Sequence, residues 1–308
     1  MSAPAYAPLC VLVGPTAAGK SSVALRVARA LDAEVVSLDS MLLYRGMDIG
    51  TDKPTDTGGV PHHLVDLLEP EEDFDLRRYI DEADAAIAAI RGRGRRVLVV
   101  GGTGLYLMGL LKGVFDGPPR DPALRARLGE EETARLHARL ADADPETAER
   151  VHPNDRRRLA RALEVLETTG RPLSELQRQF DGPDRYENVI AGLAVPRDTL
   201  RRRIAERVDA MFHAGLVAEV ERLRPRLGRT ASQAVGYKEV AAALDGAWDM
   251  AEARTRVVRH TVRLARRQAT WFKRFPVHWV DGTAPDAADR VLAVYRAAPS
   301  PPRGSTRE

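Results

Sequence analysis

The stretch that decides the fold reads Gly14-Pro15-Thr16-Ala17-Ala18-Gly19-Lys20-Ser21. It satisfies the pattern G-x-x-x-x-G-K-[ST] at every fixed position. An apolar run from Leu9 to Val13 precedes it, and apolar residues at 23, 27 and 31 follow at helical spacing. A strand, a glycine loop and a helix in this order form a cradle of backbone N–H groups for phosphate oxygens. We therefore predict that residues 14–21 bind phosphate.

Two side chains of this loop carry specific expectations. Lys20 brings a positive charge to a terminal phosphate, and the hydroxyl of Ser21 is a ligand for Mg²⁺. The other loop residues are predicted to line the phosphate site: Gly14, Pro15, Thr16, Ala17, Ala18 and Gly19. The loop indicates a phosphorylated ligand and does not specify ATP.

Outward from the loop, further apolar runs predict strands at residues 34–38, 97–100, 189–195 and 277–280. Helical spacing predicts helices at residues 76–90, after Val195 and at residues 254–274. Strands that alternate with helices imply a parallel sheet covered by helices. We therefore expect an α/β fold with a P-loop NTPase-like core.

The pattern changes after about residue 116, and residues 121–180 show only helical periodicity. We expect a helical insertion domain over residues 117–187, within a core of residues 1–116 and 188–296. The last segment, residues 297–308, has too little apolar content to fold and is expected to be disordered.

The composition limits which classes of protein fit this sequence. Lys plus Arg number 47 against 44 Asp plus Glu, so a net charge of +3 does not by itself indicate a nucleic-acid binder. There is one cysteine, Cys10, which excludes a disulfide framework within the chain. No stretch approaches the roughly 18 apolar residues of a membrane span. We expect a cytoplasmic monomer that does not enter membranes.

Positive charge is concentrated late in the chain. Residues 254–274 contain eight Lys or Arg and no Asp or Glu. Four of them recur every three or four residues and share a helix face: Arg256, Arg259, Arg263 and Arg266. A cationic face without acids favours contact with a polyanion such as RNA, although a solvated helix face is the plainer interpretation.

Several blocks recur in fixed order over roughly residues 8 to 281. Besides the phosphate loop they are residues 39–51 with Lys53-Pro54, 61–64, 101–106, 152–155 with 158 and 161–164, 233–239, and 267–268 with 270–271. Together they resemble the bacterial tRNA dimethylallyltransferase family. The chain departs from that family at Leu42, at Gln233 and at Asp52, where an alanine is usual.

The resemblance implies a reaction. Dimethylallyl diphosphate would donate its prenyl group to the exocyclic amine of the adenosine 3′ to the anticodon, with Mg²⁺ as cofactor. Asp39 follows the second predicted strand, at the edge where ligands of open α/β sheets bind, and would accept the amine proton. Thr103 would hydrogen-bond the base or the diphosphate, and Arg203 would reach the diphosphate. A turn aspartate and a structural threonine are the plainer alternatives.

The resemblance also implies a tRNA surface. A base must leave its stack to be modified, and a single-stranded loop permits this. The residues expected to contact tRNA are Asp39, Ser40, Met41, Leu42, Thr103, Arg125, Arg157, Arg158, Arg161, Gln233, Gly236, Tyr237, Lys238, Arg266, Arg267 and Gln268.

Two other classes of protein fit part of the sequence. A P-loop kinase for a small molecule explains the loop and Asp39, but leaves the cationic helix unused. The strand at residues 97–100 also ends in Gly101-Gly102-Thr103-Gly104 rather than in a Mg²⁺-binding aspartate. A non-catalytic RNA-binding protein would not need the intact Lys20 and Ser21.

Overall fold

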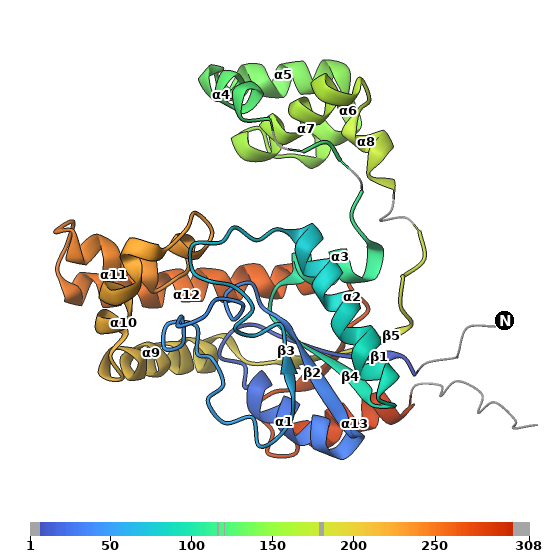
Figure 1. The fold of residues 1–308 in the computed structure, drawn as a ribbon, viewed down its shortest axis with the longest axis vertical. Coiled ribbons are helices and arrows are strands. Elements are labelled where there is room, and N and C mark those ends of the chain that lie inside the picture. The colour runs from blue at the N-terminus through green and yellow to red at the C-terminus, as the bar shows by residue number, and fades with distance from the viewer. Residues whose placement is uncertain (1–6, 116, 120, 179–181, 298–308) are drawn as a thin grey trace, which may run out of the picture. The chain divides into compact units, whose positions relative to one another are not determined.

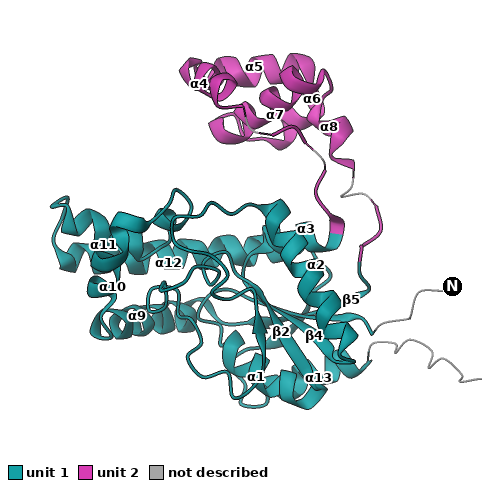
Figure 2. Ribbon diagram, in the orientation of Figure 1, with its two compact units in different colours: residues 1–111, 186–308 teal, residues 112–185 magenta. Residues whose placement is uncertain are grey.

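The computed structural model describes residues 7–115, 117–119, 121–178 and 182–297 of the chain. The chain forms two compact units, one of residues 1–111 and 186–308 and the other of residues 112–185 (Figure 2). Each unit has its own buried apolar cluster. The residues expected to form a disordered tail lie outside the described part, apart from Ala297, which ends a helix.

A parallel sheet organises the first unit (Figure 1). Its strands are β1 (Leu9–Val13), β2 (Ala33–Leu38), β3 (His62–His63), β4 (Arg96–Gly101), β5 (Asn188–Ala194) and β6 (His278–Asp281). Their order is β3-β2-β4-β1-β5-β6, and every neighbouring pair is parallel. All carboxyl ends therefore meet at one edge of the sheet. Five of the strands were predicted; β3 is two residues long and has no apolar run to reveal it.

Helices connect and cover these strands. In the first unit they are α1 (Lys20–Leu31), α2 (Leu76–Gly92), α3 (Gly104–Lys112), α9 (Arg197–His213), α10 (Leu216–Leu223), α11 (Tyr237–Leu244), α12 (Met250–Phe272) and α13 (Ala287–Ala297). Short 3₁₀ turns span Arg224–Arg226 and Ala231–Gln233. Helix α12 begins earlier than predicted because the Asp249 carboxylate accepts the Glu252 N–H at 2.7 Å and caps it.

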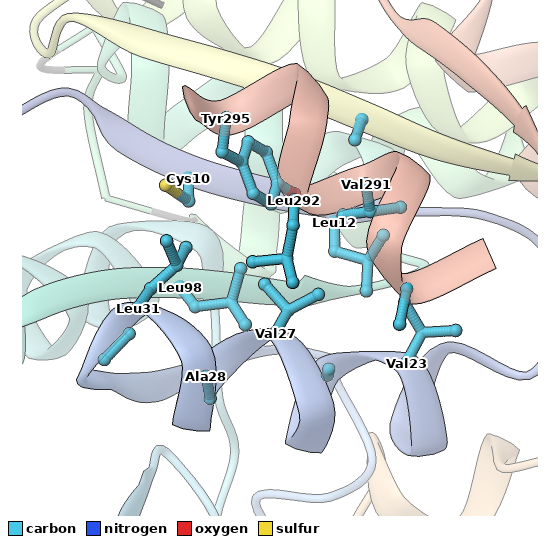
Figure 3. Packing of buried hydrophobic residues seen from close by; sticks show 14 of the residues in the cluster. Cys10, Leu12, Val23, Val27, Ala28, Leu31, Leu98, Val291, Leu292 and Tyr295 are labelled. Atoms are coloured by element: carbon cyan, nitrogen blue, oxygen red, sulfur yellow. The ribbon is translucent and has the colours of Figure 1, made fainter. Parts of the chain in front are cut away.

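Helices α1 and α13 bury their apolar faces against the sheet (Figure 3). Val27 of α1 and Val291 of α13 are fully buried with Leu12 of β1 and Leu98 of β4. Burial of each such side chain stabilises the fold by about 1.5–3 kcal/mol. The Tyr295 hydroxyl also donates to the Val11 carbonyl at 2.7 Å. This packing fixes β1 and α1, and with them the loop between them.

The second unit is helical in its described residues. Its helices are α4 (Pro122–Glu130), α5 (Thr133–Ala143), α6 (Pro145–Arg150), α7 (Arg156–Thr169) and α8 (Leu173–Leu176). Leucines from these helices, including Leu128, Leu140 and Leu159, form its core. This unit spans residues 112–185, whereas the helical insertion domain was predicted over residues 117–187.

A buried carboxylate ties this second core together. Glu164 is fully buried and receives Arg125 at 2.9 and 2.8 Å, Arg161 at 2.7 Å and the Asp121 N–H at 2.9 Å. Burial alone would raise the pKa of Glu164, but these donors outweigh it and lower the pKa to about 2. Arg125 and Arg161, which we expected to contact tRNA, therefore pair with Glu164, and about a third of each side chain stays exposed.

Among the described helices, none is both long enough and apolar enough to cross a membrane.

Candidate active site

The phosphate loop lies between β1 and α1. Gly19 takes a φ of 91°, which L side chains rarely adopt, and directs the chain into α1. No side chain caps this helix, so the N–H groups of its first turn are available to an anion. The Lys20 ammonium folds back over the loop and donates to the Pro15 carbonyl at 2.8 Å. Ser21 is exposed at the start of the helix.

Lys20 sits among charges that change its proton affinity. Burial lowers its pKa to about 8, the Asp39 carboxylate opposes this shift, and the Arg207 guanidinium adds to it. Lys20 is thus mostly protonated at neutral pH, yet easily discharged in mildly alkaline solution. An arriving phosphate would restore the ammonium by supplying negative charge.

Asp39 is the first residue after β2, at the carboxyl edge of the sheet. Its Oδ1 accepts the Met41 N–H at 2.9 Å. Burial raises the pKa of Asp39, while the Met41 N–H and the charge of Lys20 hold the increase back. A carboxylate with a raised pKa is a better proton acceptor than an ordinary surface aspartate. The structure thus places the predicted base beside the phosphate loop.

Thr103 reaches the same place from the next strand. The N–H groups of Gly102 and Thr103 both donate to the Leu38 carbonyl, at 3.2 and 3.1 Å. Leu38 directly precedes Asp39, so the end of β4 is bonded to the end of β2. A Cβ at Gly101 would lie 2.2 Å from the Leu38 oxygen, which is why the approach requires glycine.

Gln268 of α12 lines the same site at the carboxyl ends of the strands. Its side chain is buried, and Oε1 accepts the Thr16 N–H of the phosphate loop at 2.8 Å. Its Nε2 lies against Gly102, where a Cβ would be 2.2 Å away. Gln268, which was expected to contact tRNA, has partners on two loops of the protein.

Arg207 is a residue that the sequence analysis missed. Its Nη2 donates to the Thr16 hydroxyl at 2.7 Å and its Nη1 donates to Asp52 at 3.0 Å. Its Nε is buried, and the described atoms include no partner for it. Arg203, which was predicted to reach the diphosphate, lies one helical turn earlier, in a different cavity beside Gly19. Spacing of four residues puts both on one face, so sequence alone cannot choose between them.

These groups surround a small cavity of about 80 Å³. Its polar lining includes Thr16, Asp39, Arg207 and Gln268. Its apolar lining consists of Met41, Met211, Ala234, Val235, Val257 and Leu264. A site that is cationic at one side and apolar at the other suits a ligand with an anionic head and a short hydrocarbon chain.

The wall of this cavity is held by a buried carboxylate. Glu219 of α10 accepts the N–H groups of Asp48, Ile49 and Gly50 at 3.1, 2.9 and 3.1 Å. It also accepts the hydroxyl of Tyr237, which is fully buried. Burial, then the Glu219 carboxylate, raises the pKa of Tyr237 well above its usual value.

The segment expected to contact tRNA at residues 233–238 is thus partly structural. Tyr237 has no exposed surface, and the Gly236 N–H is bonded to Glu239 at 2.7 Å. Gln233 is exposed and Lys238 is partly exposed, with its ammonium 3.7 Å from Glu239. Among the polar side chains of this segment, these two are the ones that a large ligand could reach.

The cationic helix is only partly uncompensated. Arg254 is paired with Asp209 of α9, and Arg256 is paired with Glu252 at 2.7 Å. This corrects the expectation of a continuous face without acids, because Asp209 comes from a neighbouring helix and Glu252 lies in α12 just before residues 254–274. In the described part of the chain no acid pairs with four exposed arginines, Arg259, Arg263, Arg266 and Arg267.

A larger cavity of about 490 Å³ borders this helix and contains Arg266 at its rim, together with Arg197, Arg201 and Lys273. On the second unit, Arg157 is exposed and Arg158 is 3.3 Å from Asp155. Of the four arginines expected there to contact tRNA, these two remain at the surface. Arg125 and Arg161 form ion pairs with Glu164.

A phosphate loop, a partly buried proton acceptor beside it and a half-apolar cavity define an enzyme of the P-loop α/β class that transfers a group from a phosphorylated donor. The chain belongs to the IPP transferase family, whose model matches residues 42–275. A second model, described as isopentenyl transferase, matches residues 7–58.

Individual relatives agree over nearly the whole chain. A tRNA dimethylallyltransferase from Symbiobacterium thermophilum is 46% identical over 294 residues, covering 92% of each protein. One from Streptomyces avermitilis is 48% identical, covering 94% of this chain and 95% of the relative. A tRNA isopentenylpyrophosphate transferase from Bacillus halodurans has a similar structure, with a TM-score of 0.71, 38% identity and coverage of 94% and 95%. A eukaryotic dimethylallyltransferase acting on tRNA gives a TM-score of 0.82 at 26% identity, with coverage of 94% and 79%.

Proposed function

We propose that this protein is a tRNA dimethylallyltransferase. It transfers the dimethylallyl group of dimethylallyl diphosphate to the exocyclic amine of the adenosine 3′ to the anticodon and releases diphosphate. The observation that carries this proposal is the position of Asp39, a partly buried carboxylate at the strand edge whose charge interacts with that of Lys20 in the phosphate loop. A proton acceptor and a diphosphate site are the two things that alkylation of an amine by an allylic diphosphate requires.

The leaving diphosphate is held by the phosphate loop. N–H groups at the start of α1, the Lys20 ammonium and the Arg207 guanidinium would neutralise the charge that develops as the allylic C–O bond breaks. The unpartnered Nε of Arg207 is a donor that such a ligand would satisfy. We propose Arg207 in this role in addition to Arg203, because Arg207 contacts the loop through Thr16.

Asp39 removes the proton. An adenine amine is a poor nucleophile, since its lone pair is delocalised into the ring, and it must lose a proton as the new C–N bond forms. The raised pKa of Asp39 suits that transfer. The Thr103 N–H is bonded to the carbonyl of Leu38, which directly precedes Asp39, and the Thr103 hydroxyl would hold the amine or a diphosphate oxygen. Ser40, Met41 and Leu42 follow Asp39 and would line the pocket of the extruded base.

Mg²⁺ fits the residues present. The described residues contain no cluster of three or more His, Cys, Asp or Glu side chains that would hold a metal alone. Magnesium commonly takes one or two protein oxygens and completes its shell with substrate phosphates and water. The exposed Ser21 hydroxyl would supply one such ligand. Bound there, Mg²⁺ would add positive charge against the leaving diphosphate.

The tRNA would be held by its phosphates. The four unpaired arginines of α12, with Gln233 and Lys238, provide exposed contacts on the first unit, and Arg157 and Arg158 provide them on the helical insertion domain. Contacts of this kind bind a backbone without reading sequence. We further propose that the protein acts as a monomer in the cytoplasm, where its tRNA substrate lies.

One experiment tests the function directly. Purified protein is incubated with unmodified tRNA, Mg²⁺ and dimethylallyl diphosphate, and the digested tRNA is examined by mass spectrometry. An adenosine that carries one added prenyl group supports the proposal. No prenylated adenosine, together with consumption of ATP, would support a P-loop kinase instead. Lys20→Ala separates both from a non-catalytic RNA-binding protein, whose RNA affinity would not change.

A further inference from the structure

Asp52 carries the only carboxylate within ion-pair distance of Arg207 in the described residues. It occupies a tight turn, where its φ is 57° and its N–H donates to the Ile49 carbonyl at 3.1 Å. Its Oδ2 accepts Arg207 Nη1 at 3.0 Å, and Arg207 Nη2 continues to the Thr16 hydroxyl. Asp52 is therefore linked through one guanidinium to the phosphate loop.

The placement of this acid is unfavourable for an anion-binding site. Asp52 also acts on Lys20, since its charge raises the pKa of that ammonium. A carboxylate that acts on both Lys20 and Arg207 partly neutralises the positive charge that a diphosphate needs. It also repels the diphosphate directly.

The ion pair between Asp52 and Arg207 is also exposed enough for Arg207 to exchange Asp52 for another anion. The Asp52 side chain is 56% exposed and that of Arg207 is 25% exposed, so water can solvate the carboxylate once it is released. Ion pairs at such exposure contribute little to stability, so a diphosphate with several charges can displace the carboxylate.

We propose that Asp52 is an internal competitor of the diphosphate for Arg207. In the ligand-free protein it occupies the Nη1 donor. When the donor substrate binds, a phosphate oxygen replaces it, and when diphosphate leaves, Asp52 returns. Asp52 thus weakens binding of both the donor and the product and speeds diphosphate release. This inference rests on the proposed function, because it assumes that the loop holds a diphosphate.

The test measures binding of inorganic pyrophosphate, with Mg²⁺, to the full chain by calorimetry. Asp52→Asn removes the charge but keeps a side chain that tolerates a positive φ. We expect it to lower the Kd for pyrophosphate about three- to tenfold, corresponding to about 0.6–1.4 kcal/mol. The KM for dimethylallyl diphosphate should fall in parallel, while the KM for tRNA should not change.

Asp48→Asn is the matched control. Asp48 lies in the same loop and is similarly exposed, but it pairs with Lys53 at 2.6 Å and not with Arg207. Its substitution should change pyrophosphate affinity less than twofold. In an Arg207→Gln background, Asp52→Asn should not change pyrophosphate affinity further, because the guanidinium for which Asp52 and pyrophosphate compete is absent.

The outcomes are distinct. Unchanged or weaker pyrophosphate binding by Asp52→Asn, in a wild-type background that transfers the prenyl group, overturns this inference alone. Weaker binding would mean that Asp52 orients Arg207 for the ligand, and unchanged binding would mean that it does not compete. If the wild-type protein neither binds pyrophosphate through Lys20 nor prenylates tRNA, the proposed function fails and this inference fails with it.

Discussion

The Gln268 side chain accepts the backbone N–H of Thr16 at 2.8 Å, although the two residues are 252 positions apart in the chain. This bond joins the phosphate loop to the longest helix of the first unit. The same side chain presses on Gly102, directly before Thr103. The loop that would hold the donor and the loop that would hold the acceptor amine are therefore fixed by one amide.

Substitution of Gln268 should separate its structural part from any role in tRNA contact. Gln268→Leu leaves the Thr16 N–H without an acceptor, which costs about 1–3 kcal/mol at a buried position. We expect a lower melting temperature and a higher KM for dimethylallyl diphosphate, with tRNA affinity unchanged within twofold. Gln268→Glu keeps the acceptor oxygen and should retain stability. A loss of tRNA affinity alone in Gln268→Leu would contradict this assignment.

Pyrophosphate binding should depend on pH through Lys20. Its pKa is lowered to about 8 in the free protein. Because only the ammonium attracts phosphate, affinity should be constant below this pH and decrease by up to about tenfold per pH unit above it. Calorimetry between pH 6.5 and 9.5 measures the decrease. Lys20→Arg keeps its charge over this range and should bind without the alkaline decrease.

Asp39→Asn should remove the proton acceptor while preserving shape. We expect single-turnover prenyl transfer to fall about 10²- to 10⁴-fold, with tRNA binding within about twofold of wild type. In the wild-type enzyme, activity should fall as the pH drops through the pKa of Asp39, which burial raises, because protonation consumes the base. Equal rates for Asp39→Asn and wild type would exclude Asp39 as the base.

The unpaired arginines of α12 should govern tRNA affinity. Arg263→Ala with Arg267→Ala removes two exposed charges, and the slope of log affinity against log salt should decrease in magnitude by about 1.4–1.8. Filter binding at several salt concentrations measures this. Arg254→Ala with Arg256→Ala removes two charges that already have acidic partners and should change the slope less. Indistinguishable slopes in the two double variants would place the tRNA elsewhere.

Tyr237→Phe should destabilise the first unit without abolishing catalysis. It removes a hydroxyl that donates to the buried Glu219 carboxylate, and hydrogen bonds to charged groups contribute about 1.5–3 kcal/mol. Urea unfolding measures the loss. Tyr106→Phe is the control, because no hydrogen bond from its hydroxyl is found in the described structure, and its stacking on Tyr79 is kept. A stable Tyr237→Phe that loses tRNA binding would restore the predicted direct contact.

Residues at strand ends were the most predictable part of the site. Lys20, Asp39 and Thr103 each follow a buried strand, and parallel strands must bring such residues to one edge. The choice between Arg203 and Arg207 was not predictable, because it depends on how α9 crosses the loop. Nor does the sequence reveal that Arg125 and Arg161 pair with Glu164. Nothing in the sequence distinguishes Glu164 from a surface glutamate, and its burial depends on how the helices pack.

The elements of the fold likewise fall into those that could be predicted from the sequence and those that could not. Strands with continuous apolar runs were located within one or two residues. Helix α13 was not predicted, although Val291, Leu292 and Tyr295 recur at helical spacing and fill the core beside α1. Short elements whose order depends on partners distant in sequence leave little local signal.

The glycines after β4 bear on how this enzyme could change its donor. A side chain at Gly101, Gly102 or Gly104 would collide with Leu38, Gln268 or Trp271, respectively. Those backbone positions are therefore closed to gradual variation. Drift towards a longer isoprenoid should instead proceed through Met41, Met211 and Leu264, whose unbranched or mobile side chains line the cavity and can be shortened one at a time. Evolution of chain-length preference would then be confined to a few positions on one wall.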